Sequence, residues 1–207
     1  MDEVVNNPHM RAFASAFQIL IRKNLPVFLL MSGLYEHIQS LQDEKSLTFL
    51  FRAPKIRLEP LGIRSIAANY AHTFGIERKK ALSMARRTNG YSFAFQLLGF
   101  LVWEHHGLSE KTLEEYRSRL YELSYDKIWN EMSAGDRRIA FGIASAASSS
   151  VQDIRDFLGL HSNQLAPYRR RLMRKGIVDG SEWGRLTFVL SCFKDYVLER
   201  YAETEEL

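Results

Sequence analysis

The chain has 207 residues, of which 46% are hydrophobic and 25% are charged, so wholesale disorder is excluded. A count of 28 Lys and Arg against 24 Asp and Glu gives a net charge of +4, which predicts nucleic-acid binding only where the charge is clustered. A single cysteine, Cys192, excludes an intrachain disulfide framework. No apolar run approaches the ~20 residues that span a bilayer, and the acidic start Met1-Asp2-Glu3 is unlike a secretion signal. We therefore expect a cytoplasmic protein with no membrane partner.

The first predicted element is a helix that begins at Asn6-Asn7-Pro8 and ends near Asn24, because Pro26 prevents its continuation. The uninterrupted apolar run from Val27 to Met31 then favours a strand buried on both faces of a parallel sheet. Lys55 to Leu58 is a second candidate strand. Because one or two parallel strands do not make a stable sheet, we expect this segment to borrow strands from a partner or to lack upstream strands.

Helical patterns dominate from Pro60 onward. Three helices are predicted over residues 60–107, the second of which, Arg78 to Thr88, is short and basic. Residues 108–133 are predicted as a connecting helix that Ser109 caps. Its apolar face is predicted to contain Leu113, Tyr116, Leu120 and Leu123.

The remaining residues follow the order helix, helix, turn, helix, hairpin, which is typical of a winged helix-turn-helix. A break at Ser148-Ser149-Ser150 and glycines at 159 and 176 separate the helices. The predicted elements are helices over 137–147, 151–158, 164–175 and 193–201, with hairpin strands at 177–178 and 186–189.

A basic cluster marks the second helix of this helix-turn-helix. Tyr168 to Lys175 carries five cations and no acid, in the element that enters the major groove in DNA-binding versions of the motif. Residues near the helix start, including Pro167, are expected to face the groove, where Asn and Gln side chains read adenine. Arginines further along are expected to hold phosphates, and the wing adds further contacts. The predicted DNA-binding residues are Ser162, Asn163, Gln164, Arg169, Arg170, Arg174, Lys175, Trp183 and Arg185.

Two other interpretations of the basic cluster stay open. Cations in the last turns of a helix complement its dipole, and three consecutive arginines also suit a solvated face. Winged helices serve as protein–protein modules as well. Catalytic patterns are sparse: adjacent His105 and His106 point to different helix faces, and no metal site is predicted. The sequence contains no G-x-x-x-x-G-K-[S/T] phosphate loop, and by itself it shows no active site.

Several segments occur in a fixed order ahead of the winged helix. They are Asp2-Glu3, Leu25 to Gly33, Leu47 to Ala53, Ile56 to Leu61, Thr88 to Tyr91 and Gln96 to Gly99. Together with the winged helix, this order resembles the C-terminal part of a prokaryotic AAA+ or STAND-type P-loop ATPase related to origin-recognition ATPases, without its Walker A region. The resemblance covers nearly the whole chain and rests on the ordered set, because no single segment is diagnostic.

The resemblance implies roles for four residues. Asp2 and Glu3 correspond to the end of the Walker B strand, which supports magnesium and polarises the attacking water. Ser32 lies where the sensor-1 residue contacts the γ-phosphate or that water. Arg52 resembles an arginine finger, with a plain surface charge as the alternative. Thr88 to Ser92 aligns with the lid segment, although Ser92 replaces the family's proline.

The resemblance also sets the expected architecture: a mostly α (α+β) chain with the remnant of a parallel P-loop sheet, a helical lid and a C-terminal winged helix. The predicted domains are 1–59, 60–123 and 124–207. Because phosphoryl transfer needs the phosphate loop, we expect this chain alone not to bind or hydrolyse ATP. ATP and magnesium would belong to the parent ATPase, together with the missing N-terminal segment.

Two other function classes are retained: an ATP-independent winged-helix DNA-binding regulator, and a protein-interaction adaptor. An open sheet edge also favours a homodimer through the N-terminal segment.

Overall fold

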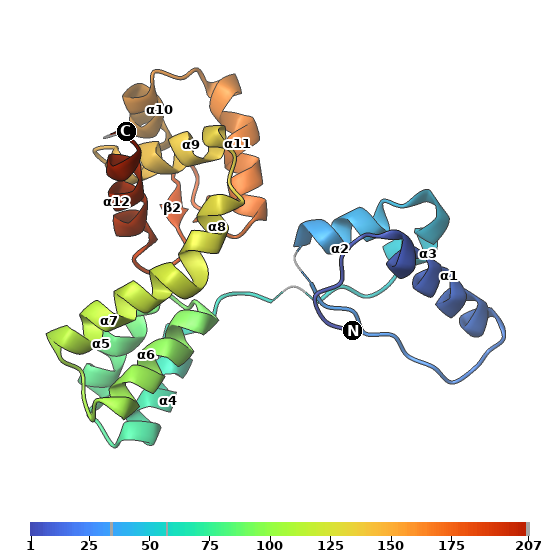
Figure 1. The fold of residues 1–207 in the computed structure, drawn as a ribbon, viewed down its shortest axis with the longest axis horizontal. Helices are drawn as coiled ribbons and strands as arrows, with labels where there is room; N and C mark the ends of the chain where they lie inside the picture. Colours follow the sequence, from blue (N-terminus) through green and yellow to red (C-terminus); the bar gives the residue numbers. More distant parts are fainter. Residues whose placement is uncertain (34, 57, 206–207) are drawn as a thin grey trace. The chain divides into compact units, whose positions relative to one another are not determined.

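The computed structural model describes residues 1–33, 35–56 and 58–205, and these residues are mostly helical, which confirms the mostly α prediction (Figure 1). The chain divides into two units, which we call unit 1 (Met1–Leu58) and unit 2 (Glu59–Leu207). This division adjoins the predicted end of the first domain at residue 59. Among the described residues, no helix combines the length and the apolar character that crossing a membrane requires.

Unit 1 is built from short helices around a small core. The predicted first helix is confirmed as α1, and the Asn7 side chain caps it by accepting a hydrogen bond from the Met10 N–H at 2.8 Å. Later helical turns, which the sequence pattern did not reveal, complete the unit. The elements are α1 (Pro8–Arg22), α2 (Tyr35–Gln42), η1 (Lys45–Leu47) and α3 (Thr48–Phe51). The buried residues are Val4, Ala14, Leu41, Leu47 and Leu50.

The predicted buried strand from Val27 to Met31 is wrong. These residues form neither helix nor strand, and Phe28 and Leu30 are 99% and 76% exposed. The second candidate strand is likewise absent at residues 55, 56 and 58, while residue 57 lies outside the described residues. A strand that is buried on both faces needs neighbours on both edges and both faces. Residues 1–4 hydrogen-bond to residues 30–32 along one edge, but Phe28 and Leu30 stay exposed.

Unit 2 begins with the three predicted helices, which are confirmed, followed by a long helical rod (Figure 1). Ser109 caps the rod as predicted, since its hydroxyl accepts a hydrogen bond from the Thr112 N–H at 3.1 Å. The elements are α4 (Ile63–Phe74), α5 (Arg78–Arg87), α6 (Ser92–Glu104), α7 (Glu110–Leu120), η2 (Tyr121–Tyr125) and α8 (Asp126–Asn130), of which η2 is a π-helical segment.

The π segment changes which residues the rod buries. Leu113, Tyr116 and Leu120 face the core as predicted, but Leu123 is 59% exposed, so its predicted burial is wrong. Tyr125 is buried instead. A π turn inserts one extra residue into the helix, so the apolar face continues at a shifted register beyond it.

The last part of unit 2 contains the predicted helices and hairpin. In the hairpin, Val178 lies opposite Phe188 in an antiparallel pair, and a bridge between Ser150 and Arg185 extends the pairing to the segment before α10. The elements are α9 (Ala134–Ser145), α10 (Val151–Leu158), α11 (Ser162–Arg174), β1 (Val178–Asp179), β2 (Thr187–Phe188) and α12 (Phe193–Glu205).

Two glycines let α9 approach its neighbours closely. A Cβ at Gly142 would lie 2.4 Å from Leu158 of α10, and a Cβ at Gly135 would lie 2.5 Å from Tyr168 of α11. One continuous core runs from Ile66 to Val197. The π segment η2 runs across residues 123 and 124, and the elements on both sides of this point share the core.

Candidate nucleic-acid interface

Helix α11 has a buried face and an exposed face. Leu165 and Leu172, seven residues apart, are buried and dock the helix onto the core of unit 2. The opposite face is exposed along its whole length. Its residues recur at spacings of three and four, which place them in one stripe, and we call this set the α11 stripe. The α11 stripe contains Asn163, Ala166, Pro167, Arg170 and Arg174.

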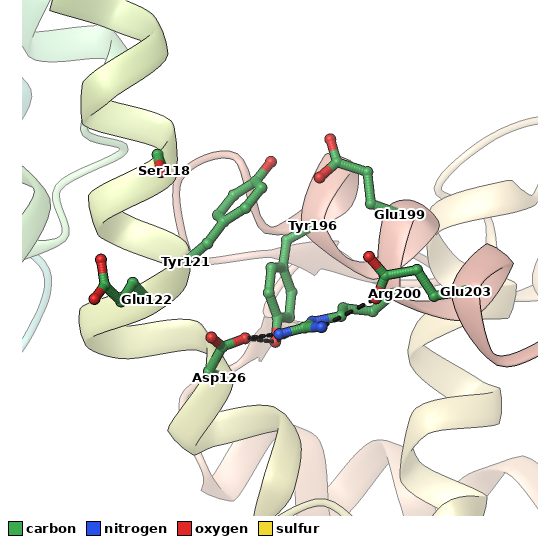
Figure 2. A pocket seen from close by; sticks show the side chains of 8 residues that line it. All are labelled: Ser118, Tyr121, Glu122, Asp126, Tyr196, Glu199, Arg200 and Glu203. Carbon is green, nitrogen blue, oxygen red and sulfur yellow. Dashed lines mark hydrogen bonds and ion pairs between the residues drawn. The ribbon is translucent and has the colours of Figure 1, made fainter.

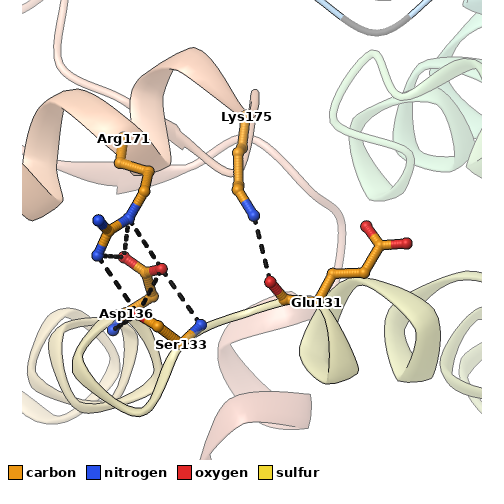
Figure 3. Close-up of polar contacts among 5 residues, drawn as sticks. All are labelled: Glu131, Ser133, Asp136, Arg171 and Lys175. Atoms are coloured by element: carbon orange, nitrogen blue, oxygen red, sulfur yellow. Dashed lines mark hydrogen bonds and ion pairs between the residues drawn. The ribbon is translucent and has the colours of Figure 1, made fainter. Parts of the chain in front are cut away.

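The five cations of the basic cluster have different surroundings. Arg171 faces α9, where its Nε donates to both carboxylate oxygens of Asp136 at 2.8 and 2.9 Å (Figure 3). Lys175 donates to the Glu131 carbonyl oxygen at 3.3 Å, and Arg169 to the Gly180 carbonyl oxygen at 3.2 Å. The remaining two, Arg170 and Arg174, are exposed and make no hydrogen bond or ion pair with the described part of the chain.

The polar side chains at the start of α11 differ in their hydrogen bonding. Ser162, Asn163 and Gln164 are all exposed. The Gln164 side-chain oxygen accepts a hydrogen bond from the His161 N–H at 2.8 Å, so this residue closes the helix N-terminus. Asn163 has no such bond in the described residues and offers both its donor and its acceptor to a ligand.

The loop between β1 and β2 presents one large aromatic side chain. Trp183 is 96% exposed, although the burial of an indole ordinarily stabilises a fold. Arg185 is held at the base of the loop, where its guanidinium donates to Ser149 Oγ at 2.7 and 2.9 Å and forms an ion pair with Glu182 at 3.3 Å. Trp183 therefore lies at the surface, whereas the Arg185 side chain is held by its contacts with Ser149 and Glu182.

The predicted residues of unit 1 are partly brought together. Ser32 Oγ donates a hydrogen bond to Asp2, and this bond, followed by one from the Glu3 N–H, holds the pKa of the Asp2 carboxyl below its usual range. Glu3 is exposed, with a φ of 49°. Arg52 lies just after α3, is exposed, and makes no contact with Asp2 or Ser32 within the described residues.

A polar pocket of about 280 Å³ that the sequence did not reveal lies between the rod and α12 (Figure 2). Partial burial raises the pKa of Asp126, but hydrogen bonds from Arg200 and Tyr196 outweigh it and leave that pKa below its ordinary value. Burial, followed by the hydrogen bond to Asp126, raises the pKa of Tyr196 to about 12. These contacts tie α12 to α8. The pocket residues are Ser118, Tyr121, Glu122, Asp126, Tyr196, Glu199, Arg200 and Glu203.

Two glutamates and a histidine lie close together at the junction of α6 and α7. Ligand atoms of Glu104, His105 and Glu115 lie within 4.8 Å of one another. The Glu115 carboxylate already contacts His105 at 2.8 Å and Arg119 at 2.5 Å. These contacts give the cluster a structural explanation.

One family model matches the chain, over residues 122–197, and its description is a domain of unknown function, DUF8462. The match runs from η2 into α12 and covers less than half of the chain. No curated protein and no solved structure gives a match to the sequence.

Proposed function

We propose that residues 124–207 form a winged helix-turn-helix that binds duplex DNA, with α11 as the recognition helix. The order of elements supports this proposal: α9, a short extended segment at Ser150, α10, α11 and the β1–β2 hairpin follow one another as in that motif. We also propose that the protein is cytoplasmic, as expected from its sequence.

The observation that carries the proposal is the α11 stripe. It offers two guanidinium groups, Arg170 and Arg174, that have no partner among the described residues and lie on the face opposite the buried Leu165 and Leu172. Arg170 and Arg174 would hold phosphates, which supplies affinity without sequence information. Asn163 near the helix start has the donor and acceptor that read adenine, and Ala166 is small and apolar enough to contact a thymine methyl group. Trp183 would lie against the backbone beside the groove.

The test is a fluorescence-anisotropy titration of duplex DNA at several salt concentrations. For Arg170→Ala/Arg174→Ala, two lost phosphate contacts are expected to reduce the magnitude of the slope of log K against log salt by about 1.8. Lys111→Ala/Lys194→Ala is the matched control, because it removes two exposed cations from other helices. An unchanged slope for the first variant would contradict the assignment of α11, and a wild-type chain that binds no duplex at low salt would favour a protein-interaction adaptor.

For unit 1 we propose a second role, as the edge of the nucleotide-binding domain of an AAA+ or STAND-type ATPase. The supporting observation is a short parallel alignment of two segments. Met1 N donates to the Leu30 carbonyl oxygen at 2.8 Å, and Ser32 N donates to the Met1 carbonyl oxygen at 2.9 Å. Val4 N then donates to the Ser32 carbonyl oxygen at 3.0 Å, so both segments run in the same direction.

The same alignment supports the proposed chemistry of the ATPase. It joins Asp2 to Ser32, the two residues that the resemblance assigns to the magnesium and to the γ-phosphate. Gly33 permits the close approach, since a Cβ there would lie 3.0 Å from the Val4 carbonyl oxygen. In this proposal ATP and magnesium are bound by the complete ATPase domain, and the exposed Phe28 and Leu30 pack under its further strands.

The gene that encodes the chain provides the test of this second role. The reading frame is expected to continue upstream of codon 1 and to encode a G-x-x-x-x-G-K-[S/T] loop, because that loop holds the phosphates during phosphoryl transfer. An in-frame stop codon just upstream of Met1 would contradict the proposal and favour an ATP-independent regulator.

A further inference from the structure

Helix α5 carries a concentrated positive charge that α11 does not explain. It contains five cations and no acid, and all five are exposed. None of them forms an ion pair or hydrogen bond through its side chain with the described part of the chain. The cations are Arg78, Lys79, Lys80, Arg86 and Arg87.

The helices next to α5 in the sequence do not balance this charge. Residues 60–104, which contain α4, α5 and α6, hold six Lys or Arg and two acids, Glu77 and Glu104. Their net charge is therefore +4, which equals that of the whole chain. The rest of the chain is close to neutral, so the charge excess noted from composition belongs to this part of unit 2.

Four of the five cations of α5 are arranged on one face, and Arg78 lies outside it. Ala81, Met84 and Ala85 are buried and fix the orientation of the helix. On the opposite side, Lys79 and Arg86 are seven residues apart and therefore share one row, about 10 Å apart along the axis. We call the exposed set the α5 face, and it contains Lys79, Lys80, Ser83, Arg86 and Arg87.

We propose that the α5 face is a second nucleic-acid contact, which binds the phosphate backbone of duplex DNA. Each strand of duplex DNA carries one phosphate per about 3.4 Å of helix axis, so two pairs of cations about 10 Å apart can meet more than one of them. The Ser83 hydroxyl between the pairs is a phosphate donor as well. Base edges are not involved, so the contact adds affinity and no sequence preference.

The composition of the α5 face favours nucleic acid over a membrane surface. A helix that binds at a membrane interface buries an apolar face among the lipids. The apolar face of α5 is already buried in the core of unit 2, and the α5 face itself contains no apolar residue. The α5 face presents cationic and hydrogen-bonding groups, which suit the regularly spaced phosphates of duplex DNA.

The α5 face lies apart from α11. In Figure 1, α4 to α6 pack at one end of the α7–η2–α8 rod, and α9 to α12 pack at the other end. The end of α5 is anchored to the hairpin segment, since Ser191 Oγ donates to the Arg87 carbonyl oxygen and the Asn89 side chain donates to the Val189 carbonyl oxygen at 2.7 Å. The α5 face is thus a contact separate from α11, and this inference shares with the proposed function its ligand but none of its residues.

The experiment compares salt slopes of DNA binding for the full chain and its variants, with a duplex of about 30 base pairs. Lys79→Ala/Arg86→Ala is expected to reduce the magnitude of the slope by about 1.8, because two phosphate contacts are lost. Lys79→Arg/Arg86→Lys keeps both charges and is expected to retain the wild-type slope. Lys111→Ala/Lys194→Ala, the control with equal charge loss, is expected to retain it too. Circular dichroism checks that each variant is folded.

The outcomes separate this inference from the proposed function. If Arg170→Ala/Arg174→Ala lowers the slope and Lys79→Ala/Arg86→Ala does not, the α5 contact is overturned and the winged-helix proposal stands. The reverse result supports the α5 contact and overturns the role of α11. If the wild-type chain binds anionic vesicles through Lys79 and Arg86 but binds no duplex, the α5 face is a membrane contact and the inference is wrong.

Discussion

Arg171→Ala is expected to lower the free energy of unfolding of unit 2 by about 3 kcal/mol, while the same change at the neighbouring Arg170 alters it by less than about 0.5 kcal/mol. The reason is the burial of Asp136, which is 1% exposed and depends on Arg171 for its ion pair. Removing the guanidinium leaves a carboxylate in the protein interior without its counter-charge. Arg170 has no such partner among the described residues.

Urea denaturation followed by tryptophan fluorescence measures this difference, because Trp103, Trp129 and Trp183 all lie in unit 2. The two variants serve as controls for each other: Arg170→Ala is expected to impair DNA binding at unchanged stability. Equal losses of unfolding free energy at Arg170 and Arg171 would show that the Asp136–Arg171 ion pair adds no stability of its own. A loss of DNA binding confined to Arg171→Ala at full stability would show that the α11 faces have been assigned wrongly.

This contrast also shows how much of the interface was predictable. Leu165 and Leu172 are seven residues apart, a helical spacing that puts both on one face of α11, and the outward direction of Arg170 and Arg174 follows from it. The position of Arg171 did not follow, because its partner Asp136 is 35 residues away on another helix. A run of consecutive arginines looks uniform in sequence, and tertiary contacts divide it into structural and exposed members.

The rod and unit 1 show two further limits of sequence reasoning. Every residue of Tyr121–Tyr125 suits a helix, so no local signal marks the π turn, yet it exchanges Leu123 for Tyr125 in the core. In unit 1 the apolar run Val27–Met31 has strand character, but strand formation depends on neighbours elsewhere in the fold. Most helices and the β1–β2 hairpin were therefore predictable, whereas α2, α3, the register shift at η2 and the absence of the expected strand in unit 1 were not.

Phe193→Ala is expected to lower the free energy of unfolding by about 3 to 5 kcal/mol. Phe193 is fully buried where α12 meets the rod, and its ring contacts Tyr125 edge to face at 5.0 Å between centroids. Truncation leaves a cavity among aromatic side chains that cannot collapse without moving the hairpin or α12. Thermal unfolding followed by circular dichroism measures the loss.

Phe28→Ala is the matched control for that substitution, since it removes the same side chain from a residue that is 99% exposed. With no apolar contacts to lose, the isolated chain is expected to keep its stability within about 0.5 kcal/mol. Sedimentation velocity on both proteins adds a second readout. A stability loss at Phe28 that grows with protein concentration, together with a change from dimer to monomer, would mean that a second copy covers this segment in solution. The absence of both effects is the result expected if further strands of the proposed ATPase domain, rather than another copy of this chain, are the natural cover of Phe28.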